Sequence, residues 1–228
     1  MNRSNIGPLV PVRVALVPDK DTVLEGKSVR IRHVDPASDT QALFAATHGA
    51  DSDPAQWTYM SYGPFADEAV MRRWMEDIDV SRDPLFMTVC DAAADAPLGI
   101  VSYLNIVTVH RTIELGNIWY IPNAQRTAVN TETIYLLLKH CFETLGYRRV
   151  EWKCDNLNER SKAAAMRLGF RFEGVFRQHF IVKGHNRDTA WFAVLDLDWE
   201  RLRSNFERVL CDPGCTASLR ELNEKIYE

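Results

Sequence analysis

The sequence lacks the features that would place it in a membrane, in a secretory pathway or on nucleic acid. It has no apolar run long enough to cross a bilayer, and residues 1–5 lack the hydrophobic centre of a signal peptide. It also has no excess of positive charge, since 27 lysines and arginines face 31 aspartates and glutamates, a net charge of -4. We therefore expect a cytoplasmic protein that binds no membrane and no nucleic acid.

Cysteine is too sparse and too scattered to serve as a framework. Five cysteines make an odd set in a chain of 228 residues, and a chain of this length can bury a core without disulfides. We expect reduced and mostly buried thiols. Cys211 and Cys215 lack the second pair that a zinc site needs, and the six histidines supply no matching motif, so we expect no metal.

What the sequence does contain is a regular succession of strand and helix patterns. Strands are expected at residues 11–17, 29–34, 85–91, 98–107, 112–121, 149–154, 175–183 and 190–197. Helices are expected at residues 35–48, 67–78, 131–145, 198–210 and 217–227. Short turns predict an antiparallel meander at 85–121, and the helix before 149–154 predicts a parallel pair. The expected class is α/β (α+β), with a mixed, mostly antiparallel central sheet flanked by helices.

The stretch from Asn158 to Gly174 is the most informative part of the chain. Asn158 or Ser161 can cap a helix start, the alanines at 163–165 favour a helix, and Gly169 suits the left-handed residue that ends one. Phenylalanines then alternate with polar residues, as a half-buried strand requires. The stretch therefore predicts a polar turn, a short helix and a strand.

This order of an Asn-x-x-Ser turn, a short helix and Gly-Phe resembles the last motif of the GNAT acyltransferases, in particular the branch of the ribosomal-protein serine and alanine N-acetyltransferases. The resemblance implies a GNAT domain at residues 29–197. Residues 1–28 are then an N-terminal extension with a short strand, and residues 198–228 a C-terminal helical tail beyond the core. It also implies acetyl-CoA as the co-substrate and direct transfer of its acetyl group to a primary amine.

The residues do not select the acceptor. The resemblance points to a protein N-terminal amine, while an amino acid or another small-molecule amine fits the same chemistry, and a homodimer is also open. Two other functions stay open. One is a catalytically silent module that binds acyl-CoA, and the other is an acyltransferase that uses a larger acyl group such as succinyl.

The expected cofactor loop departs from the family pattern. That pattern reads Gln/Arg-x-x-Gly-x-Gly/Ala, whereas residues 125–130 read Gln-Arg-Thr-Ala-Val-Asn, with Ala128 and Asn130 in place of glycines. Because a pyrophosphate binds backbone N–H groups at a helix start, this loop can hold one only in a near-helical conformation. An ordinary capped helix start is the alternative. The resemblance implies cofactor contacts from Ile118, Trp119, Tyr120, Gln125, Arg126, Thr127, Ala128, Val129, Asn130, Thr131 and Asn158.

Aminolysis of a thioester needs a base for the amine and an acid for the leaving thiolate. Glu114 is the leading base, because it shares a strand face with Gly116, where the edge would be free if the strand splays from its parallel neighbour. A solvated surface glutamate is the alternative. The resemblance assigns the acid role to Ser161. His179, on the penultimate strand, is the second candidate base, although a histidine there more often only packs.

Two further groups are candidates for the acceptor site. The aromatic segment with Trp57, Tyr59, Tyr62 and Phe65 is too irregular for a helix or strand and predicts a pocket wall, with core packing as the alternative. Asp188 closes a turn between the last two strands. It either positions the amine or caps that turn.

Overall fold

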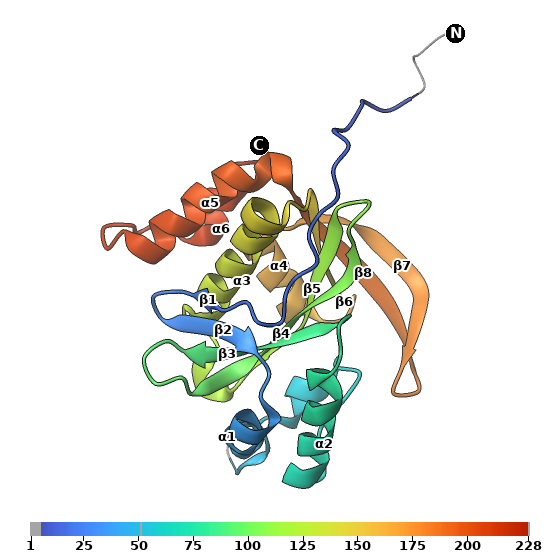
Figure 1. Ribbon diagram of the computed structural model, residues 1–228, viewed down its shortest axis with the longest axis vertical. Coiled ribbons are helices and arrows are strands. Elements are labelled where there is room, and N and C mark those ends of the chain that lie inside the picture. Colours follow the sequence, from blue (N-terminus) through green and yellow to red (C-terminus); the bar gives the residue numbers. More distant parts are fainter. Residues whose placement is uncertain (1–5, 51, 228) are drawn as a thin grey trace.

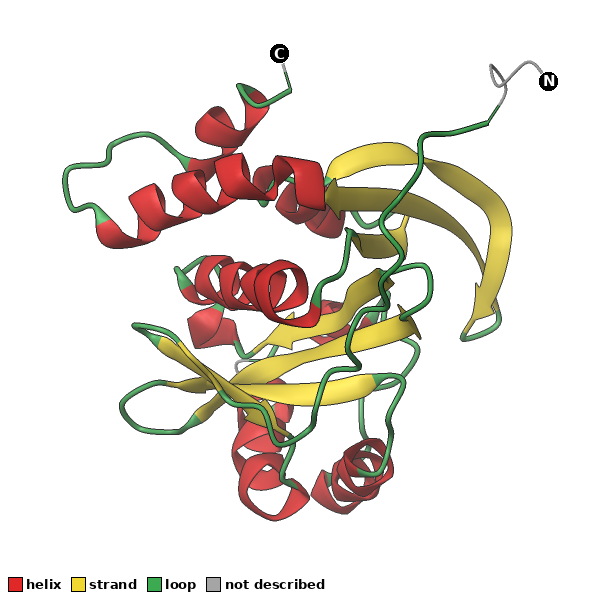
Figure 2. Ribbon diagram, turned by 45° about the horizontal axis from the view of Figure 1, so that its top comes forward, coloured by secondary structure: helices red, strands yellow, loops and turns green. Residues whose placement is uncertain are grey.

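One mixed sheet organises the molecule, with helices on both of its faces (Figures 1 and 2). The computed structural model describes residues 6–50 and 52–227, in which the sheet has eight strands in the order β1-β2-β3-β4-β5-β6-β8-β7. The strands are β1 (Leu24–Glu25), β2 (Val29–His33), β3 (Leu85–Asp91), β4 (Pro97–Val107), β5 (Thr112–Tyr120), β6 (Arg149–Asp155), β7 (Arg171–Val182) and β8 (His185–Leu195). The expected α/β class, with a mixed and mostly antiparallel sheet, is confirmed.

The helices connect these strands in a simple order. They are α1 (Pro36–His48), α2 (Glu68–Asp79), α3 (Val129–Lys139), α4 (Glu159–Arg167), α5 (Asp196–Cys211) and α6 (Leu219–Glu224), with the short turns η2 (Pro54–Trp57) and η3 (Pro122–Ala124) and the π-helical turn η4 (His140–Leu145). Strands β3, β4 and β5 form the predicted antiparallel meander. Because α3 and η4 lead from β5 to β6, these two strands run parallel, as predicted.

The parallel pair of β5 and β6 opens after a short contact. Residues 112–114 of β5 pair with residues 149–151 of β6, and beyond them the described strands separate. A bulge between Gly116 and Trp119 distorts β5 further, with Asn117 at a left-handed φ of 53°. The expected splay is therefore present, and it leaves backbone donors and acceptors of β5 without a neighbouring strand.

Two apolar clusters hold the helices to the two faces of the sheet (Figure 1). The smaller cluster fixes α1 and α2 through Leu43, Met71 and Met75, which pack against Phe86 of β3. The larger cluster lies on the other face and includes residues of α3, α4, α5 and α6. No helix of residues 6–50 and 52–227 has both the length and the apolar character needed to cross a membrane.

The C-terminal helices belong to the core, which corrects the prediction of a tail beyond it. Trp199, Leu202 and Phe206 lie on one face of α5 and are buried in the larger cluster, which Leu219 of α6 also joins. Phe206 packs on Tyr135 of α3 with ring centroids 5.7 Å apart. These side chains cover the outer face of α3, so the two helices complete the domain.

The strand predicted at residues 11–17 is absent, and the prediction was wrong. Ala15 and Leu16 donate backbone hydrogen bonds, but to two different loops, at Thr108 O (3.1 Å) and Leu145 O (2.9 Å). The alternating valines of this segment therefore meet no neighbouring strand, and most of them are exposed. The short strand of the N-terminal extension is β1, at the edge of the sheet.

Candidate active site

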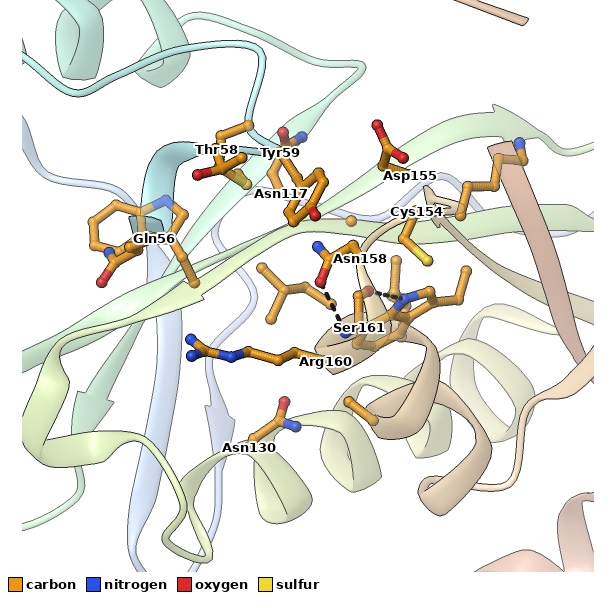
Figure 3. Close-up of a pocket in the computed structure, with 18 of the residues that line it drawn as sticks. Gln56, Thr58, Tyr59, Asn117, Asn130, Cys154, Asp155, Asn158, Arg160 and Ser161 are labelled. Carbon is orange, nitrogen blue, oxygen red and sulfur yellow. Dashed lines mark hydrogen bonds between the residues drawn. The ribbon is translucent and has the colours of Figure 1, made fainter. Parts of the chain in front are cut away.

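The opening between β5 and β6 forms the floor of a cleft of about 1600 Å³ (Figure 3). Its walls come from residues 53–61 between α1 and α2, from β5, from the loop at 125–130, from the ends of β6 and α4, and from the β7–β8 hairpin. Beside this cleft, the splayed strands leave backbone donors and acceptors of β5 without a partner strand.

The tip of the β7–β8 hairpin is tied to the segment between α1 and α2. Lys183 Nζ donates hydrogen bonds to the carbonyl oxygens of Trp57 (2.9 Å) and Gly63 (2.5 Å). Tyr59 adds a second tie, because its hydroxyl donates to the carbonyl of Leu157 at 3.1 Å. Since both segments line the cleft, these contacts bridge its walls.

The start of α3 meets the condition that its sequence sets for binding phosphate. Ala128 has φ -69° and ψ -15°, a right-handed helical conformation, and its own side chain makes no cap. The backbone N–H of Val129 donates to Thr127 Oγ1 at 3.2 Å, so the N–H groups that follow it in the first turn are the ones offered together with the positive end of the helix dipole. Of the predicted loop residues, Gln125, Arg126, Thr127 and Asn130 line the cleft, whereas Ala128, Val129 and Thr131 do not.

Arg167, at the end of α4, is a cationic cleft residue that the sequence analysis missed. It lines the cleft, and its Nη1 donates a hydrogen bond to Thr131 Oγ1 at 2.8 Å. Burial lowers the pKa of this guanidinium, since burial removes water from its charge. Arg126 and Arg160 also line the cleft, so these three arginines contribute positive charge to its lining. Figure 3 shows Arg160 on the side of the cleft that holds Asn130.

The turn before α4 holds the predicted Asn158 and Ser161 together (Figure 3). Asn158 caps the helix, since its Oδ1 accepts from the backbone N–H of Ser161 at 3.1 Å. Its amide nitrogen stays available, because capping uses only the oxygen. The hydroxyl oxygen of Ser161 accepts from Trp152 Nε1 at 2.9 Å. An indole N–H can only donate, so the hydroxyl proton of Ser161 is left free to be donated into the cleft.

Glu114 is buried in the cleft floor and is not a solvated surface carboxylate. Its exposed fraction is 5%, and its Oε2 accepts from Asn105 Nδ2 at 2.6 Å and lies 2.8 Å from Lys153 Nζ. Burial raises the pKa of Glu114, while Lys153 and Asn105 oppose that rise. Lys153 belongs to β6 and was missed in the sequence because only the parallel pairing brings it beside β5.

The aromatic segment contributes one aromatic side chain to the cleft wall. Tyr59 lines the cleft, as do the predicted Ile118, Trp119 and Tyr120 of β5. Trp57 is 1% exposed and packs with Tyr62 and Phe65 in the smaller core cluster. These three aromatic residues therefore pack in the core, which is the alternative to a pocket wall.

His179 and Asp188 have different surroundings. His179 lines the cleft on β7, where its ring lies 3.8 Å from the ring of Phe180. Asp188 is not among the residues that line the cleft. Its Oδ1 accepts from the backbone N–H of Gln178 at 2.7 Å and from Asn186 Nδ2 at 3.0 Å, so it closes a bulge of the hairpin.

The family follows from a comparison of the whole chain with known domains. The family described as acetyltransferase (GNAT) domain matches residues 28–171. The chain belongs to this GNAT family. A solved GCN5-related N-acetyltransferase from Brucella melitensis is 35% identical and superposes with a TM-score of 0.87, covering 92% of this chain and 97% of that one.

More distant relatives share the fold or part of the sequence. The ribosomal-protein-serine acetyltransferase of Escherichia coli is 25% identical over 45% of this chain and 57% of its own length. The chain thus spans about half the length of the curated relatives it matches. The microcin C7 self-immunity acetyltransferase MccE, solved with acetyl-CoA and AMP, is 19% identical with a TM-score of 0.65, over 75% of this chain and 93% of that one. At this identity, the likeness concerns the fold alone.

Proposed function

We propose that this protein is an N-acetyltransferase that transfers the acetyl group of acetyl-CoA directly to a primary amine. One observation carries the proposal. Glu114 and Ser161 line the same cleft, and that cleft follows the free edge of β5 to the loop that leads into α3. A base, an acid and two sets of backbone donors are what a thioester with a phosphate-bearing tail requires.

The cofactor end of the cleft is assigned to residues of α3, α4 and β5. The backbone N–H groups at the start of α3 bind the pyrophosphate, and Arg126 and Arg167 neutralise it. The unpaired edge at residues 118–120 binds the pantetheine arm as a strand would, and the free amide nitrogen of Asn158 donates to one of its carbonyls. The bound acetyl-CoA in MccE, which has the same fold, supports this use of the cleft.

Glu114 and Ser161 then divide the proton transfers. Asn105 and Lys153 hold Oε2 of Glu114, and Oε1 takes the proton of the attacking amine. As the nitrogen bonds to the acyl carbon, backbone N–H groups in the β5 bulge stabilise the oxyanion. The carbon–sulfur bond breaks, and Ser161 gives its proton to the thiolate. Solvent then restores the proton of Ser161 and takes up the proton that Glu114 received from the amine. Trp152 keeps the serine hydroxyl in the donating orientation. His179 is the competing base.

Direct transfer, without an acyl-enzyme, is supported by Cys154. This cysteine lines the cleft, but burial raises the pKa of its thiol. A thiol that stays protonated is a poor nucleophile, because the thiolate is the attacking form. Cys154 therefore serves as part of the wall.

The acceptor is a protein N-terminal amine or a small-molecule amine, handled by residues 29–197 in the cytoplasm. The name of the E. coli relative supports a protein amine. The acceptor reaches Glu114 from the side of Tyr59 and the β7–β8 hairpin, whereas the loop at 125–130 lies beside Gln56, to which Gln125 Nε2 donates at 3.4 Å. Tyr59 lies on that acceptor side.

Thiol release from acetyl-CoA, measured with a panel of primary amines and checked by the mass of the product, tests this function. Turnover with at least one amine, together with saturable acetyl-CoA binding in calorimetry, is the expected result. Acetyl-CoA binding without turnover by any amine would identify a silent acyl-CoA-binding module instead. Faster turnover with succinyl-CoA than with acetyl-CoA would correct the acyl group.

A further inference from the structure

Arg187 of β8 is a cleft residue with no anionic partner. Its side chain lines the cleft and makes no ion pair with a carboxylate of residues 6–50 or 52–227, and its Nε is buried without a hydrogen-bond partner there. A guanidinium keeps its charge at every physiological pH and carries five donors. A half-buried one without an anion therefore marks a place where an anion can bind.

Two other polar groups beside Arg187 are also unpaired. Trp191 Nε1 and His179 Nδ1 are buried without partners among the described residues, and the two rings lie 5.9 Å apart. The His179 ring contacts the Phe180 ring at a tilt of 42°, and the guanidinium of Arg187 lies 5.5 Å from the centre of the Phe180 ring. Because most buried polar groups in folded proteins are hydrogen-bonded, three unpaired groups at one wall point to a missing ligand.

The carboxylates nearest to this wall are already engaged. Glu114 and Glu151 share the ammonium of Lys153 at 2.8 and 2.9 Å. Asp188 accepts two hydrogen bonds within the hairpin, and Asp155 Oδ1 accepts from the backbone N–H of Leu157 at 2.9 Å. None of these four carboxylates forms an ion pair with Arg187, so its charge is left for a ligand.

The position of Arg187 separates this ligand from the cofactor phosphates. Arg187 lies on the β6 side of the opening, whereas the loop at 125–130 follows β5. Glu114 is level with Glu151 of β6 and Ala193 of β8, whereas Arg187 lies six residues further along β8, beyond the paired end of β6. An acceptor with its amine at Glu114 therefore reaches Arg187 only with a group at the far end of an extended body.

We propose that the acceptor is an amine that also carries an anionic oxygen group, a carboxylate or a phosphate, at the far end of an extended body, and that Arg187 binds this group. The inference rests on the proposed function and narrows its substrate class. Phe176 and Phe180, which are 53% and 48% exposed on β7, give the connecting part of the acceptor an apolar surface. A short peptide with a free carboxyl end has this form.

The test compares three acceptors with the full chain and acetyl-CoA. They are the tripeptide Gly-Phe-Gly with a free carboxylate, the same tripeptide as its C-terminal amide, and an aminoalkyl phosphate of matched length. We expect kcat/KM to be at least roughly ten-fold higher for one anionic acceptor than for the amide, because a charge-assisted contact usually contributes a difference of this size. Most of the difference should come from a lower KM. The better of the two anions identifies carboxylate or phosphate as the natural group.

Two variants decide whether Arg187 is responsible. R187Q should lower kcat/KM for the preferred anionic acceptor to the value for the amide. Its affinity for acetyl-CoA, measured by calorimetry, should stay within roughly two-fold of that of the parent protein. R177Q is the matched control, because Arg177 is an exposed arginine of the same hairpin that does not line the cleft, and it should keep the preference. Equal rates for acid, phosphate and amide, or equal losses for all three in R187Q, would overturn the inference. Failure of every amine would instead refute the proposed function.

Discussion

Lys153 Nζ lies 2.8 Å from Oε2 of Glu114, and the exposed fractions of the two side chains are 11% and 6%. The two residues belong to the parallel strands β6 and β5, at the point where those strands begin to separate. In this position the ammonium favours the ionised carboxylate, while burial favours the neutral acid. The balance between these two effects sets the pH at which Glu114 can act as a base.

Lys153→Met should move the acidic limb of the pH profile for kcat/KM to higher pH. The substitution removes the charge that opposes the burial effect, so the pKa of Glu114 rises further. More of the enzyme is then protonated at neutral pH, and the rate there falls. Lys139→Met is the control, because Lys139 is exposed on α3. The acidic limb of the pH profile of this variant should stay where it is in the parent protein. An unmoved limb in the Lys153 variant would show that Glu114 does not control it.

Glu114→Gln should remove the acidic limb and lower turnover by roughly 10² to 10⁴, the usual contribution of a positioned base. The amide keeps the size of the side chain and still accepts from Asn105, but it cannot take a proton. His179→Gln should keep the limb. If the His179 variant loses it and the Glu114 variant keeps it, the base is on β7 and our assignment is wrong.

Ser161→Ala should lower kcat by roughly ten- to ten-thousand-fold, with little change in acetyl-CoA affinity. The backbone N–H that Asn158 caps is unaffected by this change, so α4 keeps its start. Ser204→Ala, at an exposed position of α5, is the control and should have normal kinetics. A large loss of affinity with normal turnover would make Ser161 a binding residue.

Arg167→Gln should weaken acetyl-CoA binding by roughly ten-fold or more, because it removes a charged donor from the phosphate end of the cleft. The loss should shrink as salt is added, since screening weakens the contact in the parent protein. Calorimetry at two salt concentrations measures both effects. Arg73→Gln is the control, because it removes the same charge from an exposed position of α2. This variant should bind acetyl-CoA with unchanged affinity.

Gly169→Ala should destabilise the fold by about 2 kcal/mol or more, because a side chain there is strained and has no room. Gly169 has φ 91°, and an added Cβ would lie 2.3 Å from Leu202 Cδ2 of α5. Urea denaturation measures the effect. Gly214→Ala, in an exposed loop without a left-handed φ, should stay within about 0.5 kcal/mol of the parent. Equal stabilities of both variants would contradict the close packing of α4 against α5.

The sequence predicts those parts of the site that depend on local order. Asn158, Ser161 and Gly169 occupy the cap, the first turn and the end of one short helix, and residue spacing is enough to place them. The parallel pairing of β5 and β6 also follows from chain order, through the helix that connects them.

The parts that the sequence did not predict depend on which strands become neighbours. Lys153 contacts Glu114 only because β6 lies next to β5. Arg187 reaches the cleft only because the β7–β8 hairpin places β8 next to β6. The sequence also does not show which aromatic residues line the cleft. Tyr59 and Tyr62 are three residues apart in an irregular segment, so no periodicity separates the one that lines the cleft from the one in the core.

The hydrogen bonds from Lys183 to the carbonyls of Trp57 and Gly63 have a consequence for the width of the cleft. They join the hairpin tip to the segment between α1 and α2, and both the hairpin and that segment contribute residues to the cleft wall. While these bonds hold, the two walls cannot move apart independently. A wider cleft therefore requires Lys183 to release both carbonyls.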